Sequence, residues 1–243
     1  MTSQPRDNNR AQEDSIRLVI ADDQPLMRRA LCDFFEDEPG FEVIGQANNG
    51  TEAIELGRSL QPDAILMDLD MPEVSGVEAI ERLTAETQIR CIALTTFSSM
   101  DWVLAALRAG ASGYLVKDAA PEMIVDAVRD VMDDTMVLSP PVVELLAEQV
   151  TKSPATRSPA ASAEAPDLTE REQQVVELIA GGLNNKEIAQ ELHLSEGAVK
   201  LHVGKACDRL GARDRVQLLV RAVECGLVTP SLLRPETARD RYR

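Results

Sequence analysis

Five polar residues follow short apolar runs in the first half of the chain, and together they could bind a metal ion and accept a phosphoryl group. They are Asp22, Asp23, Asp68, Thr95 and Lys117. Three carboxylates brought together repel one another unless a cation neutralises them, and oxygen ligands in that number suit Mg²⁺. Beside such an ion, a lysine stabilises a phosphoryl group by charge and a threonine by hydrogen bonding. One carboxylate would then be the nucleophile that forms an aspartyl-phosphate.

The spacing of apolar residues predicts the sheet that would gather these side chains. Short apolar runs alternate with amphipathic stretches, which predicts an α/β domain with a doubly wound, five-stranded parallel sheet. The carboxyl ends of such strands lie at one edge, where these sheets bind ligands. The predicted strands are residues 17–20, 41–44, 64–67, 91–94 and 114–116, and the predicted helices are residues 25–36, 50–60, 75–84, 100–109 and 121–132.

The second half of the chain predicts an all-helical domain behind a linker. After Asp167 the apolar residues follow a helical period, with Thr169 and Glu172 as a capping box and with Ser195 and Asp214 as further caps. Four short helices, two of them joined by a tight turn, suit a helix-turn-helix. The predicted segments are a disordered tail (1–14), the sheet domain (15–138), an Ala/Pro/Ser-rich linker (139–166), the helical domain (167–229) and a C-terminal tail (230–243).

The net charge of −16 does not exclude a nucleic-acid partner, because the acid is unevenly distributed. Residues 15–138 hold 9 basic and 23 acidic residues, whereas residues 167–243 hold 12 of each. The apolar runs are too short to cross a membrane, and no export signal precedes the first domain, so we expect a cytoplasmic protein without a membrane partner. The four cysteines lie in apolar contexts that predict buried, reduced thiols.

The first half resembles the receiver domain of two-component systems, a flavodoxin-like fold. The matching motifs are "VIADDQPLMRRAL", "DAILMDLDMPEVSGVEAI", "IALTTF" and "GASGYLVKDAAPEMIVDAV". The resemblance implies that Asp68 accepts the phosphoryl group from a sensor histidine kinase. It implies that Asp23 and Asp68 bind Mg²⁺ with their side chains and Asp70 with its main-chain carbonyl, while Asp22 acts through water. Lys117 would contact the phosphoryl oxygens, and Thr95 and Tyr114 would form the switch that changes rotamer on phosphorylation.

The second half resembles the NarL/FixJ (LuxR-type) DNA-binding domain. The matching motifs are "LTEREQQVVELIAGGLNNKEIAQELHLSEGAVKLHV" and "RLGARDRVQLLVRAVECGLV". The resemblance implies that the third helix enters the major groove and that the fourth packs between subunits. A basic face on the third helix supports that use, since a few lysines suffice for phosphate contacts. The candidate DNA contacts are Lys186, Ser195, Lys200, Leu201, Gly204 and Lys205.

Two features of the helical domain bear on recognition and pairing. Gly204 offers no side chain to a base edge, and Ala198 lacks the hydroxyl that members of the family commonly carry there, so Lys200 and Leu201 remain the candidate groove residues, with Lys205 as a substitute. On the fourth helix an apolar i, i+3, i+4, i+7 stripe has the size to pack against the domain and against a second copy. The stripe is Val216, Leu219, Val220 and Val223.

These features predict a phosphorylation-controlled transcription regulator rather than an enzyme. It would take a phosphoryl group on Asp68 and bind double-stranded promoter DNA as a homodimer once activated. One alternative is a regulator that binds DNA independently of phosphorylation. A remote alternative is a phosphatase, because Asp68-Leu69-Asp70 forms a D-x-D motif, although here it follows the third strand rather than the first.

Overall fold

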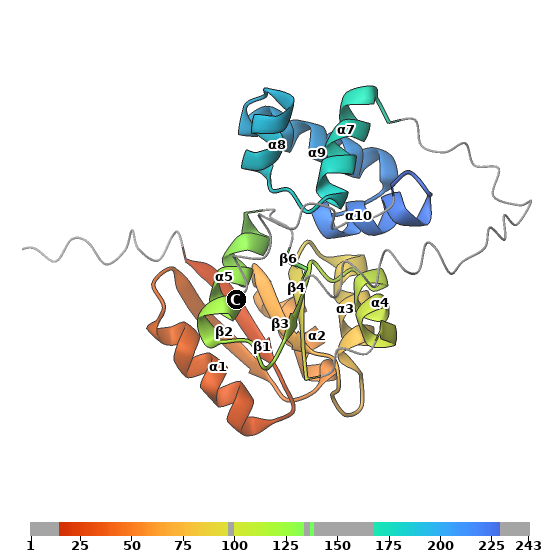
Figure 1. The fold of residues 1–243 in the computed structure, drawn as a ribbon. Helices are drawn as coiled ribbons and strands as arrows, with labels where there is room; N and C mark the ends of the chain where they lie inside the picture. The colour runs from red at the N-terminus through yellow and green to blue at the C-terminus, as the bar shows by residue number, and fades with distance from the viewer. Residues whose placement is uncertain (1–14, 97–99, 134–136, 139–167, 229–243) are drawn as a thin grey trace, which may run out of the picture.

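The apolar runs of the first half form a parallel sheet with both faces buried. The structure, a computed structural model, describes residues 15–96, 100–133, 137–138 and 168–228. The strands are β1 (Ile16–Ala21), β2 (Phe41–Ala47), β3 (Ala64–Asp68), β4 (Arg90–Thr95), β5 (Gly113–Val116) and β6 (Val137–Leu138). They pair in the order β2-β1-β3-β4-β5-β6, with every neighbouring pair parallel (Figure 1).

Helices cover both faces of this sheet. They are α1 (Pro25–Asp37), α2 (Gly50–Leu60), α3 (Gly76–Glu86), α4 (Met100–Arg108) and α5 (Pro121–Met132). Because side chains alternate along a strand, Leu18 and Ile20 of β1 belong to one apolar cluster with α1 and α5. Val19 and Ala21 belong to another with α2, α3 and α4. The predicted five strands and five helices are confirmed, and β6, whose two residues carry no periodic signal, is an addition.

The second half contains four helices, as predicted, and each begins at a polar cap. They are α7 (Glu170–Ala180), α8 (Asn185–Leu192), α9 (Glu196–Leu210) and α10 (Arg215–Glu224). Thr169 and Glu172 form the predicted capping box, and the side chains of Ser195 and Asp214 accept hydrogen bonds from the main chain of α9 and α10. Asn184 and Glu187 form a second capping box, which was not predicted from the sequence. These caps fix where each helix starts and hence how α8 and α9 are joined.

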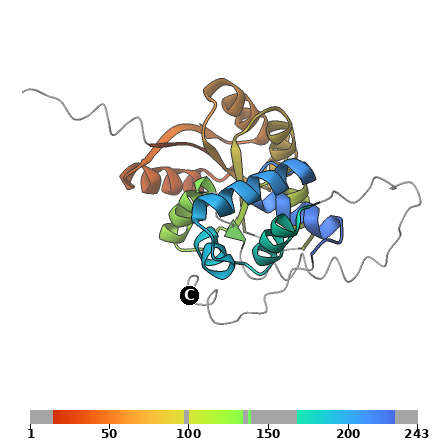
Figure 2. The same ribbon diagram turned by 90° about the horizontal axis from the view of Figure 1, so that it is seen from above.

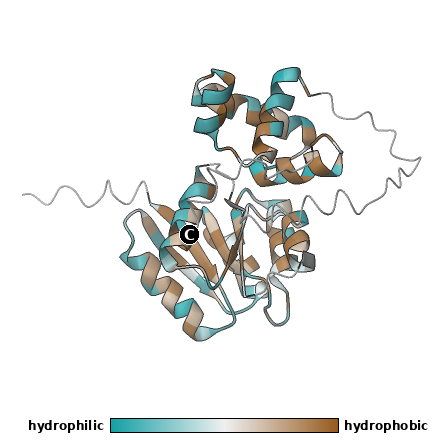
Figure 3. Ribbon diagram, in the orientation of Figure 1, coloured by the Kyte–Doolittle hydropathy of each residue, from teal (hydrophilic) through white to brown (hydrophobic). Residues whose placement is uncertain are grey.

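The two domains pack against each other through α10 and α4 (Figures 1 and 2). One buried apolar cluster runs from the α2–α4 face of the sheet into the helical domain, and apolar residues dominate both the strands and α10 (Figure 3). On α4, Trp102 is 39% exposed. Within the part of the chain that the structure describes, every helix is too short or too polar to span a bilayer.

Three of the four cysteines are buried and one is exposed. Cys32, Cys91 and Cys207 are buried as predicted, but the prediction is wrong for Cys225, which is exposed because it caps the C-terminal end of α10. The predicted N-terminal tail, linker and C-terminal tail lie outside the described residues.

Candidate functional site

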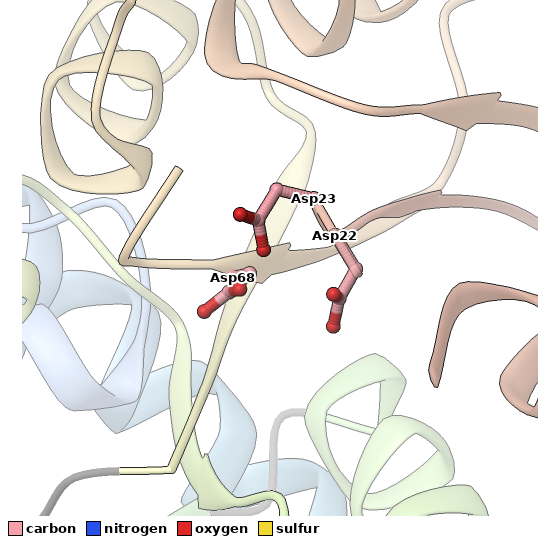
Figure 4. A group of neighbouring side chains, drawn as sticks. All are labelled: Asp22, Asp23 and Asp68. Atoms are coloured by element: carbon pink, nitrogen blue, oxygen red, sulfur yellow. The ribbon is translucent and has the colours of Figure 1, made fainter. Parts of the chain in front are cut away.

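Three aspartates meet at the carboxyl edge of the sheet (Figure 4). Asp22 and Asp23 follow β1, and Asp68 is the last residue of β3, which lies beside β1. One carboxylate oxygen from each residue lies within 4.8 Å of the others. Asp22 and Asp68 are buried, at 0% and 3% exposure. The parallel sheet therefore brings together the residues that the sequence placed at separate strand ends.

A buried lysine joins two of these aspartates. Lys117 follows β5, and its Nζ lies 2.7 Å from Asp22 Oδ2 and 2.7 Å from Asp68 Oδ2. Burial by itself lowers the pKa of Lys117, but the two carboxylates outweigh this effect and hold the pKa above its usual value. Burial raises the pKa of the Asp68 carboxyl, and the ammonium group of Lys117 offsets part of that rise. The lysine is thus charged and aimed at Asp68.

The charges and donors of this pocket suit a divalent cation. Three carboxylates and one ammonium leave two negative charges uncompensated among these four groups. Oδ1 of Asp23 is buried and has no hydrogen-bond partner among the described residues, so a ligand atom is available there. Arg28 of α1 donates from Nη1 to the main-chain oxygen of Asp22 at 2.6 Å and fixes the loop that carries both aspartates. This positioning contact was not predicted, because Arg28 carries no distinguishing local pattern.

The predicted switch residues, Thr95 and Tyr114, are both buried, on the neighbouring strands β4 and β5. Thr95 ends β4 and is 3% exposed. Tyr114 of β5 is fully buried, and burial raises the pKa of its hydroxyl to about 12. The aromatic ring of Tyr114 therefore lies in the interior of the receiver domain. Asp70 is exposed, and its main-chain N–H donates to Asp68 Oδ1 at 3.3 Å.

The loop after Asp68 depends on a glycine at the start of α3. A Cβ at Gly76 would lie 1.9 Å from the Asp68 carbonyl oxygen and 2.7 Å from the Leu69 Cα, so the backbone itself would have to move. We expect Gly76→Ala to destabilise the protein by about 1–3 kcal/mol, as overpacking does, and to slow phosphoryl uptake by displacing Asp68. Urea unfolding followed by circular dichroism measures the first effect.

The matched variant for this test is Gly204→Ala on α9, where an added Cβ meets nothing within 4 Å. It should stabilise the protein by about 0.5–1 kcal/mol, because alanine is the better helix former. Equal stability of the two variants would contradict the role assigned to Gly76.

The helix predicted to read DNA presents an open face. Its buried residues, which include Val199, Val203, Ala206 and Leu210, pack inward as the helical period predicts. All six candidate contacts are exposed, and Leu201 reaches 57%. They are Lys186, Ser195, Lys200, Leu201, Gly204 and Lys205.

The predicted pairing stripe on α10 is buried within the single chain. Val216, Leu219, Val220 and Val223 are each exposed by 9% or less. The sequence predicted that part of this stripe packs in the core of its own domain. It did not anticipate that α10 also lies against α4 of the first domain.

Two protein-family models match the chain. The model described as "Response regulator receiver domain" matches residues 18–129, and the model described as "Bacterial regulatory proteins, luxR family" matches residues 166–222. The first match covers the aspartate pocket, and the second covers α7, α8, α9 and most of α10.

Relatives are similar along most of the chain. Transcriptional regulatory protein LnrK of Bacillus subtilis is 39% identical over 219 residues, which cover 87% of this chain and 98% of the relative. The nitrate/nitrite response regulator protein NarL of Escherichia coli K12 is 34% identical, over 84% of this chain and 93% of the relative. A solved LuxR-family two-component response regulator from Aurantimonas is 29% identical with a TM-score of 0.53, and the match covers 57% of this chain and 99% of that one.

Proposed function

Because this chain belongs to the response regulators that join a receiver domain to a LuxR-type DNA-binding domain, and is a phosphorylation-controlled transcription regulator, we propose that Asp68 is its phosphoacceptor. One observation carries this assignment: Lys117 Nζ lies 2.7 Å from Asp68, beside two further carboxylates. A carboxylate in this setting is both oriented and partly neutralised, which favours its attack on a phosphoryl group.

The cation we propose for the pocket is Mg²⁺. Asp23 and Asp68 would bind it through their carboxylates and Asp70 through its main-chain carbonyl, with Asp22 acting through water. When bound, it would supply positive charge to the phosphoryl oxygens. Asp68 would attack the phosphorus of a phosphohistidine, so that a P–O bond forms, the P–N bond breaks and the imidazole takes up a proton. Lys117 would hold the transferred oxygens, and Thr95 and Tyr114 would respond as the switch.

The proposed partners are a sensor histidine kinase and double-stranded promoter DNA, both of which a cytoplasmic protein can meet. The test of the central assignment is incubation with acetyl phosphate, with Mg²⁺ or with EDTA. Mass spectrometry should then detect one acid-stable but hydroxylamine-labile phosphoryl group, only with Mg²⁺. Peptide mapping that places the adduct elsewhere than Asp68, or an adduct formed equally in EDTA, would contradict the proposal.

A second candidate function, the D-x-D phosphatase, has one specific motif in its favour, Asp68-Leu69-Asp70. In the structure, the side chain of Asp70 is exposed and its main-chain N–H donates to Asp68 Oδ1 at 3.3 Å, an arrangement that favours a role of Asp70 in the loop over that of a general acid. We propose that the protein does not turn over phosphomonoesters. Steady release of phosphate from p-nitrophenyl phosphate would argue for the enzyme.

For the DNA interface, we propose that α9 enters the major groove and that Lys200 contacts a phosphate. Lys200→Ala should weaken binding and lower the slope of log affinity against log salt by about one unit. Fluorescence anisotropy over a KCl series measures this, with a duplex that the protein selects from random sequence.

The control for this experiment is Arg82→Ala, which removes an exposed cation of the receiver domain that pairs with Glu78. It should leave the salt slope unchanged. If both variants retain the wild-type slope, α9 is not the helix that contacts the phosphates.

A further inference from the structure

The turn between β2 and α2, residues 47–50, contacts both loops that carry the proposed cation ligands. On one side, the main-chain N–H of Asp22 donates to the main-chain oxygen of Ala47 at 3.1 Å. On the other side, Gly50, the first residue of α2, lies directly against the main chain of Val74. The β2–α2 turn therefore joins the β1–α1 loop to the β3–α3 loop, although it carries no cation ligand of its own.

The contact with the β3–α3 loop leaves no room for a side chain at Gly50. A Cβ at this position would lie 2.2 Å from the carbonyl oxygen of Val74 and 2.9 Å from its carbonyl carbon. Because both atoms belong to the backbone, the β3–α3 loop itself would have to move to accommodate a methyl group. Glycine thus lets the main chain of α2 support this loop directly.

Two asparagines fix the conformation of the β2–α2 turn. Asn49 is 9% exposed, and its Oδ1 accepts the main-chain N–H of Glu52 at 2.8 Å, which caps α2. Nδ2 of Asn49 donates to Asn48 Oδ1 at 2.9 Å. Asn48 in turn donates from its main-chain N–H and from Nδ2 to the Glu52 carboxylate, both at 3.0 Å. These local hydrogen bonds give the two loops a turn of defined shape to pack against.

The β3–α3 loop contains a residue that depends on such support. Glu73, next to Val74, has a φ of +67°, a left-handed conformation that residues other than glycine seldom adopt. Conformations of this kind persist where the surrounding structure determines them. The main-chain N–H of Gly76 closes the loop by donating to the main-chain oxygen of Leu69 at 3.0 Å. A displacement at Val74 is therefore transmitted within this closed loop to Asp70.

We propose that Gly50 and Asn49 are positioning residues of the phosphorylation pocket, and that the β2–α2 turn sets the affinity for Mg²⁺ by fixing the two loops relative to each other. This proposal rests on the proposed function in taking Mg²⁺ as the cation and Asp68 as the phosphoacceptor. Neither positioning residue is itself a ligand, and both act through the main chain of the two loops. Loss of a group that orients metal ligands commonly weakens metal binding by about 10–100-fold.

Gly50→Ala in the full-length protein is the first test. The Kd for Mg²⁺ should rise about tenfold, because the added Cβ displaces the main chain of Val74 and with it that of Asp70. The increase of the urea midpoint with Mg²⁺ concentration gives this Kd without a measurement of activity. With acetyl phosphate, the Mg²⁺ concentration for half-maximal rate should shift by the same factor, and the rate at saturating Mg²⁺ should remain close to wild type.

Gly57→Ala is the matched control on the same helix. An added Cβ there would lie 2.6 Å from Cδ2 of Leu83, so the strain falls on the end of a side chain of α3 and not on loop backbone. This variant should lose stability but keep the wild-type Kd for Mg²⁺. An equal rise of the Kd in both variants would reduce Gly50 to a packing role and overturn the proposal.

Asn49→Ala and Asn49→Ser test the turn without an added clash, and they decide the question if Gly50→Ala does not fold. Alanine removes the cap of α2, whereas serine retains an oxygen that accepts the main-chain N–H of Glu52. In Asn49→Ala, the amides of Asp22 and Gly76 should exchange hydrogen faster in EDTA, and the Kd for Mg²⁺ should rise by a smaller factor than in Gly50→Ala. Serine should restore both toward wild type. Wild-type exchange and Mg²⁺ affinity in Asn49→Ala would contradict the role of the turn.

Phosphoryl uptake measured on the same samples separates this proposal from the proposed function. If Asp68 accepts phosphate and Gly50→Ala binds Mg²⁺ as tightly as wild type, the turn does not position the pocket and the phosphoacceptor assignment stands. If exchange and Mg²⁺ affinity change as expected but the phosphoryl group is found on another residue, the turn is supported and the phosphoacceptor assignment fails.

Discussion

Asp68→Asn should abolish phosphoryl uptake from acetyl phosphate in Mg²⁺, whereas wild type acquires one phosphoryl group. Asparagine has nearly the same shape, so the fold should survive, but its amide oxygen is a poor nucleophile and removes one charge from the pocket. Asp22 and Asp23 follow β1, so neither carboxylate takes the position of Asp68 at the end of β3, where Lys117 Nζ lies 2.7 Å from Oδ2. Intact-protein mass spectrometry after a fixed incubation provides the measurement.

The matched control is Asp118→Asn, which changes an exposed carboxylate at the same edge of the sheet, one residue after Lys117. It should retain wild-type uptake. If Asp68→Asn is phosphorylated to the wild-type extent, another residue is the acceptor and the assignment of this pocket is wrong.

Lys117→Met should both prevent efficient phosphoryl transfer and destabilise the protein in the absence of divalent cations. Methionine preserves much of the side-chain volume, but Asp22 and Asp68 then remain buried and repel each other without a counter-charge. Removing one partner of a buried ion pair costs about 3–5 kcal/mol. Urea unfolding in EDTA measures this loss.

Mg²⁺ should restore part of that stability, because a cation that binds only the folded pocket replaces the missing charge. At a concentration one hundred times its Kd, such a ligand adds about 2.7 kcal/mol. The comparison variant is Arg58→Met, which removes an exposed ion pair and should cost less than about 1 kcal/mol with or without Mg²⁺. A Lys117→Met protein as stable as wild type in EDTA would show that the lysine does not balance these charges.

The sequence predicted the aspartate pocket, because the parallel arrangement of the strands decides which residues meet at its edge. Asp22, Asp68 and Lys117 belong to three different strand ends, yet they meet because parallel strands place their carboxyl ends at one edge. The helix caps at Thr169, Ser195 and Asp214 were equally predictable, since each acts within four residues of itself. Both kinds of inference depend on local rules that a single chain displays.

The contact of Asp214 with the receiver domain could not be predicted in the same way. Its contact with Ser112 joins residues 102 positions apart, and no local pattern distinguishes a serine that faces solvent from one that faces another domain. The apolar stripe on α10 posed a similar problem. Its period showed that a face would be buried, but the identity of the covering surface depends on how the domains are arranged.

The position of Trp102 gives the molecule an intrinsic optical probe. It is the only tryptophan of the chain, and it lies on α4, the helix that packs against α10. Because this residue is partly exposed, a change in the surroundings of α4 alters the polarity around the ring and shifts its emission. Stopped-flow fluorescence can therefore time events at this helix after mixing with Mg²⁺ and a phosphodonor, without any label.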